Sequence, residues 1–130
     1  MEESFKHKLY NFGGPPLLLD GSMGRYLEEE YEIKRDTLTW MLKALLDEDL
    51  HPTVIEAHQD YIAAGSDVIT TFNYAAVPIF LNNIDCLEEM GRLNELAATL
   101  ARKAIETYNF EERVEKPRKI WIAGALPTPG

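Results

Sequence analysis

The feature that most constrains this chain is a short apolar run that ends in a carboxylate and two glycines, residues 17–24 (LLLDGSMG). Three leucines bounded by turn-forming residues are typical of a strand buried on both faces of a sheet. Pro15 and Pro16 precede the run and cannot donate backbone hydrogen bonds, so they fix where the strand begins. Asp20 is then expected at the carboxyl end of the strand, where parallel α/β folds bind their ligands.

Two later stretches predict strands that lie beside the first. Residues 67–72 are rich in β-branched side chains, and residues 119–124 form an apolar stretch after a proline. About 50 residues separate one strand from the next, and crossovers of this length join parallel strands. The predicted fold class is therefore α/β, with about three parallel strands, intervening helices and too few strands for a closed barrel.

Helices are predicted from the spacing of apolar residues over 23–30, 36–46, 51–64 and 87–108. Ser22 would cap the first of them, while Pro52 suits the first turn of the third and Gly65 its end. His58 lies on the apolar stripe of the third helix. That position favours a hydrogen-bonded core histidine over a catalytic one.

Composition excludes several classes of partner and location. The chain has 130 residues and a net charge of −9, which suits one domain and argues against nucleic acid or an anionic membrane as a partner. Cys86 is the only cysteine, so no internal disulfide is possible. No apolar run approaches the roughly 20 residues that span a bilayer. Residues 1–14 form a polar lead-in without the apolar core of a signal peptide, so a cytoplasmic location is expected.

Four segments carry a more specific pattern. They are an apolar run followed by Asp-Gly and a small residue (18–24), a helix with a histidine, an Asp-Tyr pair and an Ala-Gly-Ser-Asp ending (51–67), and the strand endings 67–75 and 122–127. In this order they resemble the homocysteine S-methyltransferase family, whose fold is a (β/α)8 TIM barrel. The resemblance covers residues 15–130 and implies the N-terminal portion of that barrel, truncated after its third strand.

The activity that the resemblance implies is methyl transfer to the thiol of homocysteine, which gives methionine. In that family zinc holds the substrate sulfur as a thiolate beside three protein cysteines, because a free thiol is mostly protonated at neutral pH. Those cysteines lie in the second half of the barrel, and Cys86 matches none of them. We therefore assign no catalytic residue and no metal ligand, expect no zinc on this chain alone, and leave open whether the chain is an enzyme.

The resemblance implies that this chain contains only one part of the substrate pocket, the wall that holds the amino-acid end of homocysteine. The predicted substrate-binding residues share a place at the tips of the first two strands: Asp20, Gly21, Ser22, Thr71, Asn73 and Tyr74. Asp20 would accept hydrogen bonds from the ammonium group of the ligand. Each residue also has a structural interpretation, with Asp20 as a turn or capping residue and Tyr74 as a packing residue.

Two other interpretations stay open. The chain could be a non-catalytic relative that completes its sheet by pairing with another polypeptide, either a separate second half or a copy of itself, because its outer strands have uncovered edges. It could also belong to a different barrel family that shares the Asp-Gly turn. If the barrel is completed, the expected partners are homocysteine and a methyl donor, whose identity the sequence leaves undetermined.

Overall fold

The strand at the centre of the sheet is β1 (Val68–Thr70), which pairs in parallel with β2 (Trp121–Ala123). On the other side of β1, the segment around Leu19 forms a single parallel bridge to Val68. The computed structural model describes residues 14–32, 40–111 and 118–126. Within those ranges the α/β class and the parallel direction of the three segments are confirmed, and the sheet does not close into a barrel.

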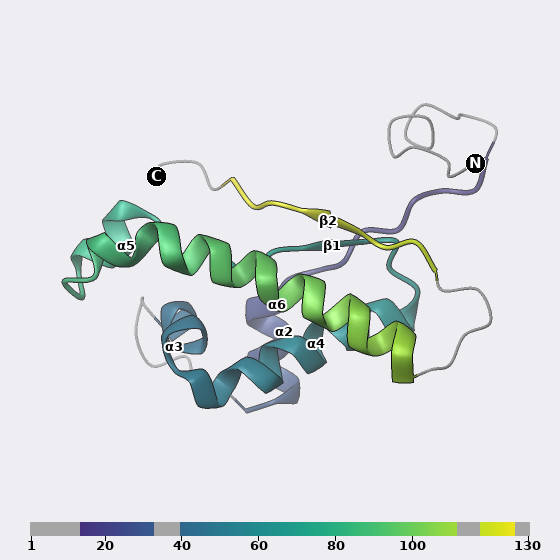
Figure 1. Cartoon of the computed structure of the whole chain (residues 1–130), viewed down its shortest axis with the longest axis horizontal. Helices are drawn as coiled ribbons and strands as arrows, with labels where there is room; N and C mark the ends of the chain where they lie inside the picture. Colours follow the sequence, from purple (N-terminus) through teal and green to yellow (C-terminus); the bar gives the residue numbers. More distant parts are fainter. Residues whose placement is uncertain (1–13, 33–39, 112–117, 127–130) are drawn as a thin grey trace.

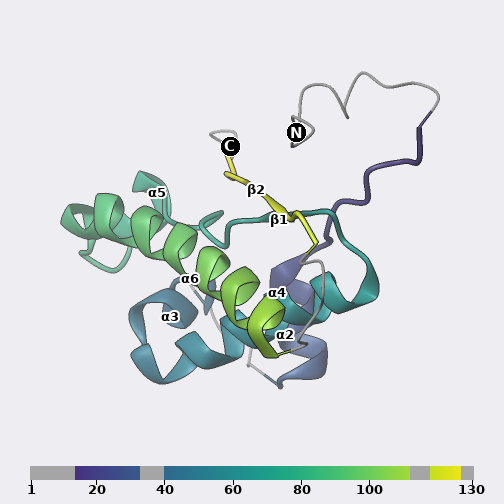
Figure 2. The same ribbon diagram turned by 45° about the vertical axis from the view of Figure 1, so that its right-hand side comes forward.

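Helices cover one face of this sheet (Figure 1). In chain order they are α2 (Met23–Glu30), α3 (Trp40–Leu46), the 3₁₀ turn η1 (Glu48–Leu50), α4 (His51–Ala64), α5 (Pro78–Asn82), the 3₁₀ turn η2 (Leu87–Glu89) and α6 (Met90–Glu111). The view turned by 45° shows α6 running beneath the strands with α2 and α4 beside it, and both α4 and α6 contact the sheet, α4 at β1 and α6 at β2 (Figure 2).

Local signals account for the helix ends. The Ser22 side chain accepts a hydrogen bond from the backbone N–H of Arg25 and so caps α2, as predicted. Pro52 lies in the first turn of α4, and Gly65 ends that helix with a φ of +116°, a backbone conformation that side chains disfavour. The predicted start of the second helix, at residue 36, lies outside the described residues.

Two apolar clusters hold the helices to each other and to the sheet. The larger joins α2, α3, α4 and α6 and is built on fully buried side chains such as Leu27, Leu42 and Leu93. In the smaller, Ile69 of β1 packs with Ile62 of α4 and with side chains of α6.

No helix within the described ranges is long and apolar enough to cross a membrane.

The prediction that the first strand is buried on both faces is wrong. Leu18 is 51% exposed and Leu19 is 69% exposed. Helices cover only one face of the sheet, and no described element lies beyond the outer edge of this segment, so its leucines face solvent. The strands are also shorter than the stretches 67–72 and 119–124 that predicted them.

The remaining differences concern one helix and one histidine. The short helix α5 was not predicted, and α6 begins at Met90 because residues 87–89 form a separate 3₁₀ turn. His58 is fully buried, as expected of a core residue. Neither of its ring nitrogens has a hydrogen-bond partner, however, so the prediction of a hydrogen-bonded histidine is wrong.

Candidate functional site

The carboxyl ends of the three parallel segments meet at one end of the sheet. Asp20 ends the first segment and contacts Thr70 of β1. Beyond β1, the Asn73 side-chain amide donates to the carbonyl of Ala125, which follows β2, with an N–O distance of 3.3 Å. The prediction that Asp20 and Asn73 lie level with each other and with the tip of the third strand is therefore confirmed.

Asp20 carries a partly buried carboxylate that a single neighbour holds at both oxygens. The backbone N–H of Thr70 donates to Oδ2 at 2.8 Å, and the Thr70 hydroxyl donates to Oδ1 at 3.0 Å. Burial raises the pKa of Asp20 above its ordinary value, and the hydrogen bonds from Thr70 act in the opposite direction. Each carboxylate oxygen has two lone pairs, so both can accept a further hydrogen bond from a ligand.

Thr71 and Asn73 tie the tips of the strands to each other. The Thr71 hydroxyl donates to Asn73 Oδ1 at 2.7 Å and accepts from the backbone N–H of Ala125 at 3.2 Å. Asn73 Nδ2 also donates to Oδ1 of Asn94 on α6 at 2.6 Å. The polar atoms of both predicted residues are thus engaged within the chain. A ligand would have to share or replace these contacts.

A tyrosine from α4 supports the turn after Asp20. The Tyr61 hydroxyl donates to the carbonyl of Ser22 at 3.3 Å. A Cβ added at Gly21 would lie 3.0 Å from that hydroxyl oxygen, which leaves room for little more than a glycine there. Burial raises the pKa of Tyr61, and the charge of Asp20 adds to this effect.

Beside this turn lies a pocket of about 490 Å³ that is mostly apolar. Its walls come from the turn and first helical residues 21–25, from the start of α3, from the end of β1 and the loop after it, and from Ala125. Four of the predicted substrate-binding residues line it: Gly21, Ser22, Thr71 and Tyr74. Asp20 and Asn73 lie next to the lining without forming part of it.

Trp40 and Met41, which the sequence analysis did not assign to the site, form the wall contributed by α3. Trp40 is the first residue of α3 and is buried. A Cβ added at Gly24 would lie 3.2 Å from two ring atoms of Trp40, so the glycine lets α2 approach the indole closely. The paired Gly21 and Gly24 around Ser22 are the sequence signal that could have indicated two aromatic neighbours.

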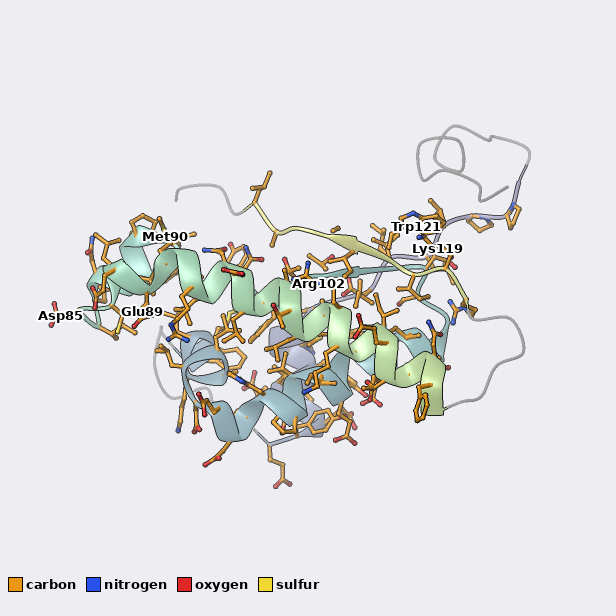
Figure 3. The ribbon with its side chains drawn as sticks, in the orientation of Figure 1. Asp85, Glu89, Met90, Arg102, Lys119 and Trp121 are labelled. Carbon is orange, nitrogen blue, oxygen red and sulfur yellow. The ribbon has the colours of Figure 1, made fainter. Side chains whose placement is uncertain are left out.

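The donor set for a metal is not present in the described part of the chain. No three His, Cys, Asp or Glu side chains gather there closely enough to hold an ion. Cys86 precedes η2 and does not line the pocket. Its neighbour Asp85 and the nearby Met90 lie at the opposite end of the molecule from Lys119 (Figure 3). The residues described do not fit a zinc site.

Comparison with known proteins gives a consistent result. A sequence profile described as homocysteine S-methyltransferase matches residues 17–130. The metallated form of the homocysteine methyltransferase MmuM from Escherichia coli is similar to the chain, with a TM-score of 0.76, 26% identity and coverage of 92% of this chain and 41% of that one. For its oxidized form the TM-score is 0.73 and the identity 30%, over 85% and 37% of the two chains. The chain therefore spans about two fifths of that relative's length.

Proposed function

Because the chain belongs to the homocysteine S-methyltransferase family, we propose that it supplies the part of a homocysteine-binding (β/α)8 barrel that holds the amino-acid end of the substrate. The carboxylate of Asp20, at the strand tips and beside an apolar pocket, is the observation that carries this proposal. Homocysteine has a matching shape, with an ammonium and a carboxylate at one end and two methylene groups and a thiol at the other.

The proposed contacts follow from the chemistry of the two ends of homocysteine. The ammonium group would donate to the free lone pairs of Asp20, which gives a charge-assisted hydrogen bond in a partly dry site. The methylene groups and the sulfur would lie against Met23, Met41 and the ring of Trp40, since sulfur packs well against aromatic edges. Tyr74, 53% exposed at the pocket wall, could close over the ligand. Thr71 and Asn73 would then shape the site mainly by fixing the strand tips.

The methyl transfer itself needs a thiolate, and zinc would supply it in the family by binding the sulfur. We infer that this chain's residues bind and orient the substrate but do not hold the metal. The chain alone is therefore expected to retain far less than one zinc after dialysis and to form no methionine from homocysteine and a methyl donor. Metal analysis that finds one tightly bound zinc per chain would overturn this inference.

Homocysteine binding to the purified chain, followed by backbone amide NMR, tests the proposal. We expect a dissociation constant in the millimolar range, about −4 kcal/mol, with the largest shifts at Gly21, Ser22 and Thr70. The analogue in which hydrogen replaces the amino group is expected to bind at least about tenfold more weakly. Asp20→Asn should remove this preference, whereas Asp49→Asn, at an exposed position in η1, should leave it unchanged. Equal binding of homocysteine and the analogue would contradict the proposal.

A second candidate function is favoured by the exposed leucines of the first strand segment. With Leu18 and Leu19 51% and 69% exposed at an edge that no described element covers, the sheet could be extended by another chain. The chain would then act as a non-catalytic partner. Size-exclusion chromatography with light scattering distinguishes the candidates. A stable monomer at tens of micromolar would count against pairing with a second copy.

A further inference from the structure

The first strand segment ends because a side chain takes over its hydrogen-bonding role. The backbone N–H of Val68 donates to the carbonyl of Leu18 at 3.2 Å, and the N–H of Asp20 donates to the carbonyl of Val68 at 3.0 Å. In a parallel ladder the next bond would join the N–H of Thr70 to the backbone carbonyl of Asp20. Here that N–H donates to the carboxylate Oδ2 of Asp20 instead, at 2.8 Å.

The side chain of the same threonine completes the contact. Its hydroxyl donates to Oδ1 at 3.0 Å, so the two carboxylate oxygens are held by two donors of one residue. Because threonine is branched at Cβ, its χ1 angle is restricted, and the hydroxyl has little freedom to leave this position. The plane of the Asp20 carboxylate is consequently fixed relative to β1, and Thr70 itself lines the pocket.

We propose that Thr70 is a positioning residue, which orients the Asp20 carboxylate so that its free lone pairs face a primary ammonium group of the ligand. The identity of the ligand rests on the proposed function above, but the orientation of the carboxylate does not. The backbone N–H of Thr70 alone would hold Oδ2, but the carboxylate could still rotate and move Oδ1 away from its position. The hydroxyl is therefore the group on which the orientation depends.

The charge state of Asp20 gives a readout that a merely structural role would not move. Burial raises the pKa of Asp20, while the hydrogen bonds from Thr70 stabilise the ionised form. Loss of the Thr70 hydroxyl leaves Asp20 buried and removes one of these hydrogen bonds. Among the described residues, the Tyr61 hydroxyl interacts electrostatically with Asp20, and this substitution does not change that hydroxyl.

Thr70→Val and Thr70→Ser are the matched variants, since valine keeps the shape of threonine and serine keeps its hydroxyl. Carbon NMR of the side-chain carboxyl measures the pKa of Asp20 in each 130-residue variant. We expect valine to raise it by about one pH unit and serine to leave it close to the wild-type value. An unchanged pKa in Thr70→Val would overturn the proposal. If that variant does not fold, Thr70→Ala against Thr70→Ser provides the same comparison.

Affinity for homocysteine, measured on the same variants, tests the ligand part separately. We expect binding to weaken about tenfold in Thr70→Val and to recover in Thr70→Ser. If the Asp20 pKa rises in Thr70→Val but the wild-type chain binds no homocysteine, the orienting role of Thr70 stands and the proposed function is refuted. Normal affinity in Thr70→Val, with homocysteine bound at Asp20, would refute the positioning role.

Discussion

His58 is expected to make the stability of this protein fall below neutral pH. Its side chain is fully buried in α4, and neither ring nitrogen has a hydrogen-bond partner. Burial lowers the pKa of His58 from 6.5 to about 4. Between these values the unfolded chain binds a proton that the folded chain does not accept, so the free energy of unfolding decreases as the pH falls from about 6.5 towards 4.

The size of the effect follows from the two pKa values. Each pKa unit corresponds to about 1.4 kcal/mol, so the full loss, reached near pH 4, is about 3 kcal/mol. At pH 5.5 the imidazole is about ten times more often protonated than neutral in the unfolded chain and is neutral in the folded one. The expected loss between pH 7.5 and pH 5.5 is therefore about 1.4 kcal/mol.

Urea denaturation of the wild type and of His58→Leu, at pH 7.5 and pH 5.5, measures this contribution. Leucine has a similar volume and no buried nitrogens, so the variant should fold at least as stably and lose about 1.4 kcal/mol less on acidification. The raised pKa of Asp20 acts with the opposite sign, but it is common to both proteins and cancels in the difference. The same pH dependence in both proteins would refute the reasoning and require a partner for the imidazole.

Backbone and side-chain contacts around α4 give the remaining predictions. Gly65→Ala should lower the free energy of unfolding by about 1–2 kcal/mol because of its φ of +116°, whereas Gly91→Ala, in open space in α6, should raise it by roughly 0.5 kcal/mol. Urea denaturation compares the two, and equal effects would contradict the left-handed conformation of Gly65. Asp60→Ala removes the acceptor of the Tyr26 and Tyr31 hydroxyls and should cost about 1–3 kcal/mol. Alkaline ultraviolet titration should show the pKa of Tyr26, about 12 in the wild type, fall towards its ordinary value.

Features that depend on neighbouring residues were predictable from the sequence. Pro52 and Gly65 mark the ends of α4, and Ser22 caps α2, because each acts on the backbone within one turn of its own position. The exposure of Leu18 and Leu19 was not predictable, because an apolar run reports what a segment can bury and not what lies against it. The lack of a hydrogen-bond partner for His58 was not predictable for the same reason, since it depends on which groups pack against the imidazole.

Some residues of the candidate site were also predictable from the sequence, and others were not. The position of Asp20 at a strand tip followed from the apolar run and the turn after it, and the structure has Asp20 there, in contact with Thr70. The wall formed by Trp40 and Met41 comes from a helix that the sequence assigned to packing, and helical periodicity does not distinguish a buried face from the side of a pocket. Thr70 was missed because its contact with Asp20 spans 50 positions.

The parallel pairings also bear on how the chain folds. Leu19 pairs with Val68, and Val68 with Trp121, so each contact joins residues about 50 positions apart, and the described strands form no hairpin that would shorten the search. Closing such loops lowers the conformational entropy of the chain before the strand contacts that offset this loss can form. Folding is therefore slower than that of a helical bundle of the same length. The backbone hydrogen bonds within helices α4 and α6 are local, and the two helices pack on each other, so they can form first and bring the strand segments together. Assembly of the strand tips, and with them the pocket, would then be the late and rate-limiting event.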